Sequence, residues 1–332
     1  MKPCARNDGS MQWLTFESGL TIVELMISMT LGLLVVMAAT ALLLSSKVAY
    51  VTEDEDARLQ ETGRYALDVM ARAVRQAAFE NWDKDDAPVQ TRLQYSANVI
   101  GLDARTLKES SSGIDAPLTS SINGSDVLAV RFFGIGAGEH GDGSILNCAG
   151  SAVQEPASQE TAEEDRGWSI FYVAKGVGGE PELYCKYRGK KSWTTGAIAT
   201  GIESFQVLYG VDTDGDGLPN AYMTATAINA LDGGAGPEGA GMQATGGRGD
   251  ARWQNVVAVK IALLLRGTEG SGTPAAKAQY DLFGKEYADS NAANDPGTRL
   301  AVADLPPTLR NRLRKIFTQT ITVRNCVTGS RT

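Results

Sequence analysis

The sequence is poor in the side chains from which most catalytic and nucleic-acid-binding sites are built. Its one histidine, His140, lies in a glycine-rich stretch, with no serine or cysteine arranged around it as in a catalytic triad. The four cysteines include no CxxC pair, which argues against a zinc site. Lysine and arginine form no cluster and the formal net charge is −8, so no nucleic-acid partner is expected. The sequence therefore offers no catalytic constellation, and we expect that the protein is not an enzyme.

What the sequence does contain, near its start, is one long apolar run over residues 20–44, interrupted by a single charge at Glu24. As a helix, this run spans about 37 Å, enough to cross the ~30 Å hydrocarbon core of a bilayer. A cleavable secretory signal would be shorter and would end at a small-residue cleavage site. Here the small residue, Gly19, precedes the run. Any cleavage is therefore expected before the helix, which then remains as an anchor.

The segment Gly-Leu-Thr-Ile-Val-Glu-Leu at residues 19–25 resembles the prepilin signature of type IV pilins and type II secretion pseudopilins. The resemblance implies that a membrane-embedded prepilin peptidase cuts between Gly19 and Leu20 and methylates the new amino terminus of Leu20. A carboxylate in a membrane helix is costly and by default functional. By resemblance, Glu24 meets the amino terminus of a neighbouring subunit. The leader before Gly19 is charge-neutral, with Lys2 and Arg6 against Asp8 and Glu17, so the positive-inside rule gives little help with orientation, and Met11 is an alternative start.

Several later runs are similar to those of the minor pilin family PilW. They lie at residues 63–68, 209–217, 255–260 and 317–325. The resemblance implies an α+β, type IV pilin-like fold, in which a long N-terminal membrane-spanning helix packs on an antiparallel β-sheet globular domain. It also implies a single-pass inner-membrane precursor with a periplasmic domain, which then joins the extracellular pilus tip and primes assembly. The implied partners are other minor pilins, the major pilin and a large tip adhesin.

The expected organisation is a leader at 1–19, a transmembrane half-helix at 20–44, an amphipathic periplasmic half-helix at 45–80 and a β-rich domain at 81–332. The helix is expected to continue past the membrane because residues 47–78 contain no proline and repeat apolar residues with helical spacing. Residues 233–249 are rich in glycine and are predicted to be a mobile loop, and residues 267–307 are predicted to be irregular. Strands are predicted at residues 127–133, 169–174, 183–187, 202–209, 222–227, 256–265 and 317–323.

An acidic loop is the one part of the chain whose residues suggest a ligand. Asp212, Asp214 and Asp216, followed by Gly217, match the first half of an EF-hand-like calcium loop. With Leu218 and Asn220 at the seventh and ninth positions, they form the predicted calcium site. The twelfth position is Met223, so the usual bidentate carboxylate is missing or comes from elsewhere. The alternative is a solvated Asp-Gly turn between two strands.

The cysteines suggest an oxidising compartment, such as the periplasm. Cys148 and Cys185 flank a predicted strand pair, and a bridge between them would stabilise the fold by roughly 4 kcal/mol on a chain-entropy argument. This preferred pairing leaves Cys326 free. Cys326 could instead pair with another pilin subunit or replace one member of the bridge.

Three classes of function follow from these observations. The first, which we favour, is a PilW-like fibre subunit, with a minor pseudopilin of a type II secretion system as its near relative. The second is an anchored calcium-dependent surface binding module, for which Glu24 would be dispensable. The third, a membrane-tethered enzyme, lacks the catalytic residues it would need.

Overall fold

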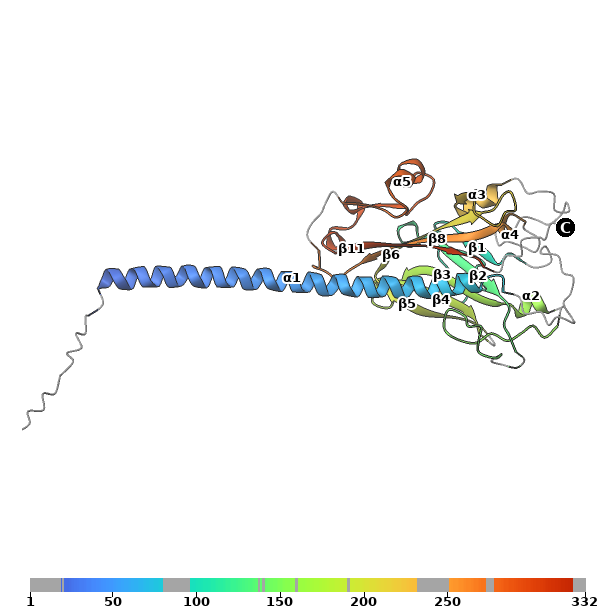
Figure 1. Ribbon diagram of the computed structural model, residues 1–332, viewed down its shortest axis with the longest axis horizontal. Helices are drawn as coiled ribbons and strands as arrows, with labels where there is room; N and C mark the ends of the chain where they lie inside the picture. Colours follow the sequence, from blue (N-terminus) through green and yellow to red (C-terminus); the bar gives the residue numbers. More distant parts are fainter. Residues whose placement is uncertain are drawn as a thin grey trace, which may run out of the picture. The chain divides into compact units, whose positions relative to one another are not determined.

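The computed structural model describes residues 19, 21–79, 96–136, 138, 141–158, 161–189, 192–231, 251–272 and 278–324. The chain divides into two compact units, residues 1–51 and 52–332. The boundary therefore falls inside the first helix, α1, which spans Ile22–Gln76 (Figure 1). Several predictions lie outside the described residues: those for most of the leader, Leu20, His140, the glycine-rich stretch 233–249 and Cys326.

The part of α1 in the first unit is an apolar helix without protein around it. Every side chain from Ile22 to Val51 is exposed. Within the described residues, α1 is the one helix that is long and apolar enough to cross a membrane. A helix that is apolar on all sides needs lipid or other helices to cover it, because water would otherwise contact its whole circumference.

The part of α1 in the second unit is amphipathic and packs on the globular domain. Its buried side chains recur at helical spacing and include Leu59, Ala66, Met70, Ala73 and Val74. The helix approaches the domain so closely that a Cβ at Gly63 would lie 2.6 Å from the ring of Phe317. Burial of this apolar face supplies most of the stability of such a helix.

Polar contacts also fix α1 to the domain at the start of the second unit. The Glu55 carboxylate is buried and accepts hydrogen bonds from the backbone N–H and the hydroxyl of Thr268, at 3.1 and 2.8 Å. Next to it, the Lys315 ammonium lies 2.9 Å from the Asp56 carboxylate. Of the acidic residues at 53–56, these two therefore face the domain, while Glu53 and Asp54 are exposed.

Within the described residues, the globular domain contains two large antiparallel sheets and one small two-stranded sheet. The five-stranded sheet has the order β1-β2-β3-β4-β5 and the four-stranded sheet has the order β11-β8-β6-β7. The first is made of β1 (Val99–Leu102), β2 (Val127–Phe132), β3 (Gly167–Lys175), β4 (Pro181–Arg188) and β5 (Trp193–Thr200). The second is made of β6 (Ile202–Val211), β7 (Ala221–Met223), β8 (Val256–Arg266) and β11 (Arg314–Thr322). The α+β architecture, with a long apolar N-terminal helix and antiparallel sheets, is confirmed.

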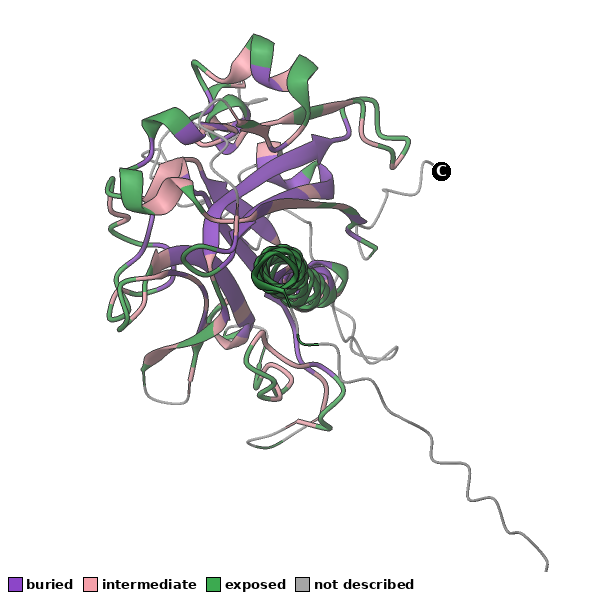
Figure 2. Ribbon diagram, turned by 90° about the vertical axis from the view of Figure 1, so that its left-hand side faces the viewer, coloured by how far each residue is buried: buried purple, intermediate pink, exposed green. Residues whose placement is uncertain are grey.

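The helix and the two sheets share one apolar core. Buried residues are concentrated in the strands of both sheets (Figure 2), and a single cluster joins them to the buried face of α1. The outermost strand of each sheet flanks the helix: Phe317 of β11 lies against Gly63, and Ile198 of β5 lines a hollow together with Tyr65. The second half of α1 is therefore part of the core.

Buried contacts also connect the two sheets where β1 and β2 lie close to β6. The Asp126 carboxylate, just before β2, accepts hydrogen bonds from the backbone N–H groups of Ala104 and Val207, both at 2.9 Å. Tyr209 of β6 lies directly against Gly101 of β1, and its hydroxyl is buried. Burial raises the pKa of Asp126 well above its usual range, and Asp103 adds to this effect.

Residues 267–307 are more ordered than the sequence suggested. They contain β9 (Gln279–Asp281), α5 (Lys285–Asn291) and β10 (Arg299–Ala301), and β9 pairs with β10. This small layer packs on β8 through a second apolar cluster, made of Ala262, Leu264, Leu282, Leu300 and Leu305. The prediction of an irregular segment was wrong here. The apolar residues of this segment are few and widely spaced, so they give no periodic pattern in the sequence, and they become buried only by packing on β8.

The predicted strand at 222–227 was wrong in its second half. Strand β7 ends at Met223, and the helix α3 (Ala225–Ala230) begins directly after it. The hydroxyl of Thr224 accepts a hydrogen bond from the backbone N–H of Ala227, which caps the helix, and the distant Asp103 carboxylate accepts from the N–H groups of Ala225 and Thr226. The remaining short elements are α2 (Ala162–Asp165), α4 (Ala251–Gln254), α6 (Pro307–Arg310), η2 (Ile122–Gly124) and η3 (Val302–Asp304).

We expect Gly101→Ala to destabilise the domain, because a Cβ at this position would lie 1.8 Å from the Tyr209 hydroxyl oxygen. Forcing a methyl group into such a contact costs on the order of 1–3 kcal/mol or more. In the background of Tyr209→Phe, which removes that oxygen, the same change should cost less. Thermal unfolding of the two single variants and the double variant measures this coupling, and additive effects would contradict the close contact.

We also expect Asp295→Asn to change how stability depends on pH. Burial raises the pKa of Asp295 to about 6, above its usual value, although the hydrogen bond that the Tyr287 hydroxyl donates to it at 2.9 Å acts in the opposite direction. The folded state therefore binds this proton more tightly than the unfolded state, and stability is lost as pH rises from the unfolded pKa of about 4 to the folded pKa of about 6. The variant should gain about 1.4 kcal/mol relative to the wild type between pH 5 and pH 8, because about one pH unit of that window lies in this interval. Chemical denaturation at both pH values tests this, with Asp304→Asn as the exposed control.

Candidate functional site

The start of α1 carries the predicted processing and assembly residues. The Thr21 hydroxyl accepts a hydrogen bond from the backbone N–H of Glu24 at 3.2 Å, which caps the first turn of the helix. Glu24 lies in this first turn and is exposed, so its carboxylate is next to the positive end of the helix dipole. Gly19 has open space where a Cβ would lie. Leu20 is outside the described residues, so the cut between Gly19 and Leu20 stays a prediction.

The acidic loop connects β6 to β7, and the structure brings its three aspartates together. One carboxylate oxygen from each of Asp212, Asp214 and Asp216 lies within 4.8 Å of the others. Asp212 directly follows the last residue of β6, and its carboxylate accepts hydrogen bonds from the backbone N–H groups of Gly215 and Gly217, at 2.6 and 2.9 Å. The bond from Gly217 is the main reason why the pKa of Asp212 is below its usual value.

The other predicted calcium ligands are less well placed. The side-chain oxygen of Asn220 accepts hydrogen bonds from the N–H and hydroxyl of Thr213, while its NH2 group donates to Asp214 at 3.0 Å. The Leu218 side chain is 63% exposed. Met223, at the twelfth position, is the last residue of β7 and pairs with Tyr209 of β6. The three carboxylates could thus hold a cation. The turn is also stabilised by its own hydrogen bonds, so calcium binding stays a prediction.

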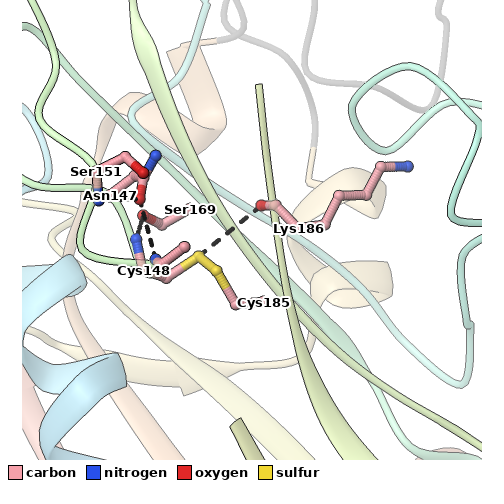
Figure 3. Close-up of a disulfide and its surroundings, with 7 residues drawn as sticks. Asn147, Cys148, Ser151, Ser169, Cys185 and Lys186 are labelled. Atoms are coloured by element: carbon pink, nitrogen blue, oxygen red, sulfur yellow. Dashed lines mark hydrogen bonds between the residues drawn. A yellow bond between two sulfur atoms is a disulfide. The ribbon is translucent and has the colours of Figure 1, made fainter. Parts of the chain in front are cut away.

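The predicted disulfide between Cys148 and Cys185 is confirmed. Their Cα atoms are 5.9 Å apart, and the bond fastens the loop after β2 to strand β4 (Figure 3). The backbone N–H of Cys148 also donates to the Ser169 hydroxyl at 2.9 Å. Because Ser169 lies on β3, the loop is fixed to two neighbouring strands.

A comparison with known protein families finds one match. Residues 170–325 match the family model of PilW, described as Type IV Pilus-assembly protein W. The resemblance to the PilW family is confirmed. The matched segment begins within β3 and includes the acidic loop, β8 and β11. The matched segment does not include α1. The prepilin-like signature at residues 19–25 therefore lies outside the family match.

A type IV-like pilin from Thermus thermophilus is similar in structure. It shares 14% sequence identity with the chain at a TM-score of 0.37, and the comparison covers 81% of this chain and 98% of that one. A likeness at this level does not establish a shared function. No curated protein matches the chain. The PilW match and the apolar helix together support a pilin-related role in a type IV pilus.

Sequence reasoning also missed a buried ionic group in the four-stranded sheet that carries the acidic loop. Glu203 is fully buried in β6 and bonded to Arg266 of β8 and Arg314 of β11, at 3.2 and 2.5 Å. Glu203 lies in a predicted strand that also contains Ser204 and Gln206, so the charge of Glu203 within this strand was the available signal. Its arginine partners lie far along the chain, and only the sheet brings them together.

We expect Asp214→Ala and Asp216→Ala to lower the melting temperature of the full-length protein in detergent when calcium is present. The physical reason is that a bound cation stabilises only the folded state, and each change removes one carboxylate from the group. In a chelator the same changes should have smaller effects. An equal loss with and without calcium would mean that the turn matters and the ion does not. Asp54→Ala, at an exposed acid on α1, is the control.

Proposed function

We propose that the protein is a minor type IV pilin of the PilW kind, which helps to initiate pilus assembly and forms part of the tip complex. The observation that carries the proposal is the combination of two parts in one chain. One is a helix whose first part is apolar from Ile22 to Leu44 and exposed, with Glu24 in its first turn. The other is a β-rich domain whose residues 170–325 match the PilW family.

In this proposal, prepilin peptidase cuts between Gly19 and Leu20 and methylates Leu20, and the helix then leaves the inner membrane to pack against other pilin helices. Glu24 is close to the new amino terminus and would pair with that of a neighbouring subunit. Such a pair would compensate a carboxylate that is otherwise costly among apolar helices. The partners would be other minor pilins, the major pilin and a large tip adhesin.

Two alternatives use the same residues differently. A minor pseudopilin of a type II secretion system would share the helix and the cleavage signature, and would differ in its partners. An anchored calcium-dependent binding module is favoured by one observation, the convergence of Asp212, Asp214 and Asp216 in the acidic loop. That module would keep its leader and would not need Glu24.

The deciding experiment is the amino-terminal sequence and mass of the protein from membranes of cells with and without the prepilin peptidase. We expect a mature chain that begins at methylated Leu20 only when the peptidase is present. If the leader remains in both strains, the protein is an ordinary anchored protein, and the calcium-dependent module becomes the better explanation.

We expect Glu24→Ala to leave the protein in the membrane and to reduce its amount in sheared pili at least severalfold. The apolar helix is kept, but the carboxylate that would pair with a neighbouring amino terminus is lost. Immunoblots of membrane and sheared fractions measure both quantities. Glu53→Ala, at an exposed acid farther along the same helix, should have no effect. Normal abundance of the Glu24 variant in sheared pili would rule out the assembly role of this carboxylate.

A further inference from the structure

Three aspartate carboxyl groups from separate parts of the chain lie close together where β1 and β6 meet the small layer of β9, α5 and β10. Asp126, just before β2, accepts a hydrogen bond from the backbone N–H of Ala104, the residue after Asp103. Asp295 follows α5, in a segment that packs tightly against η2, the short helix just before Asp126. The charges of Asp103 and Asp295 both act on Asp126, and Asp126 and Asp295 are almost fully buried. We call these three groups the carboxyl cluster.

Within the residues that the structure describes, the carboxyl cluster has no cationic partner, because none of its three members forms an ion pair there. From β9 to β10 the chain contains two cationic side chains, Lys285 and Arg299. Lys285 pairs with Asp289. Arg299 pairs with Asp281 and Asp289. When fully ionised, the carboxyl cluster would therefore hold an unbalanced negative charge away from water, which is costly.

The surroundings of the carboxyl cluster also contain more hydrogen-bond acceptors than donors. The NH2 group of Gln206 donates to the carbonyl oxygen of Gly124 in η2 at 2.8 Å, which places this side chain next to the cluster. Its other side-chain atom, Oε1, is buried and has no hydrogen-bond partner among the described residues. A protonated carboxyl group brings an O–H donor to such a place, whereas an ionised carboxylate can only accept.

Protons are accordingly held more tightly in the carboxyl cluster than in the unfolded chain. Burial raises the pKa of Asp126 well above its usual range and that of Asp295 to about 6, and the charge of Asp103 acts in the same direction on both. Two tyrosine hydroxyls also face the cluster, Tyr209 from β6 and Tyr287 from α5. Burial raises the pKa of both hydroxyls, so neither is charged near neutral pH.

The three carboxyl groups differ in the part of the domain to which they are attached. Asp126 accepts from two backbone N–H groups, one after β1 and one in β6, and Asp103 accepts from two at the start of α3. Asp295 instead accepts from the hydroxyl of Tyr287, which belongs to the same small layer. Repulsion between the ionised groups therefore acts between the layer and the rest of the domain.

The layer is attached to the domain through a small area. It lies at the periphery of the globular domain, with α5 outermost (Figure 1), and its apolar side chains pack on β8 in a cluster separate from the main core. Near the carboxyl cluster, the Ser204 hydroxyl of β6 donates to the carbonyl oxygen of Gly297 at 3.2 Å. A unit with a small core of its own can open while the rest of the domain stays folded.

We propose that the carboxyl cluster is a pH-sensitive latch, which keeps the layer of β9, α5 and β10 closed on β8 while it is protonated and lets the layer open as protons are lost. The opening is local, and the two large sheets stay folded. The inference concerns the globular domain alone, so it does not depend on pilin processing, on fibre assembly or on calcium.

The size of the effect follows from proton linkage. In the open layer the Asp295 carboxyl group contacts water and has an ordinary pKa of about 4, whereas in the closed layer its pKa is about 6. Between these two values each pH unit shifts the equilibrium about tenfold towards the open layer. From pH 5 to pH 8 we therefore expect the opening equilibrium constant to rise about tenfold through Asp295 alone.

The test is amide hydrogen exchange of the full-length protein in detergent, followed by mass spectrometry at several pH values from 5 to 8 and corrected for the intrinsic exchange rates. Peptides from residues 279–301 report on the layer, and peptides from residues 256–266 report on β8. The layer should open about tenfold more at pH 8 than at pH 5. Low denaturant should change this opening little, because a local opening exposes little surface, and β8 should exchange more slowly throughout.

Two variants assign the effect to the carboxyl cluster. Asp295→Asn cannot ionise and should reduce the rise between pH 5 and pH 8 to less than about twofold. Asp304→Asn, at an exposed acid in η3, is the matched control and should keep the rise of the wild type. Tyr287→Phe removes a hydrogen bond that favours the ionised form of Asp295, so its rise should continue to a higher pH. Melting curves check that each variant folds, and Tyr287→Phe keeps the test decisive if Asp295→Asn does not fold.

Three outcomes would overturn the proposal. The first is opening of the wild-type layer that does not change with pH. The second is exchange of the layer at the same rate as β8 at every pH, which would mean that the domain opens only as a whole. The third is opening of the layer at pH 5 on addition of a chelator, which would mean that a bound cation, and not protons, holds the carboxyl cluster together.

Discussion

The fold depends on the burial of one face of α1 against two sheets at once. Leu59, Met70 and Val74 lie on this face and are almost fully buried, and each large side chain contributes about 1.5–3 kcal/mol by leaving water. Since β5 and β11 are the outermost strands of their sheets, the helix covers the open side of the core between them. Removing this face would expose the interior of both sheets, which explains why a helix with a membrane-like first half has an amphipathic second half.

Polar groups then decide how the sheets are aligned around that core. Glu203, Arg266 and Arg314 come from three adjacent strands and form a buried ionic group. Asp126 ties the five-stranded sheet to β6 through backbone N–H groups. Burying the charges of the ionic group has a desolvation cost, and breaking one of its ion pairs typically costs several kcal/mol, because the partner is left unpaired. These groups therefore favour this arrangement of the sheets over arrangements in which the strands are shifted relative to one another.

Strong local patterns in the sequence predicted the corresponding elements well. The helix was expected from apolar spacing and the lack of proline, and β2, β6, β8 and β11 were expected from β-branched runs. Strand β5, Trp193–Thr200, was missed because its glycine, alanine and threonine residues give no clear alternation. Strand β5 forms because its backbone pairs with that of β4. The helix α3 was missed for a similar reason, since the Asp103 carboxylate that supports its start lies far away in the sequence.

The sequence by itself determined the features that depend on composition over a short stretch. They are the membrane-length helix with its Gly19 and Glu24 signature, the acidic loop and most strand positions. The tertiary structure decided which distant residues meet: it joined Cys148 to Cys185 rather than leaving either for Cys326, and it surrounded Glu203 with arginines. It also brought Tyr65 of α1 and Ile198 of β5, which lie far apart in the chain, to the same hollow. Local patterns follow from steric preference and hydrophobic periodicity, whereas these contacts depend on how the sheets pack around the helix.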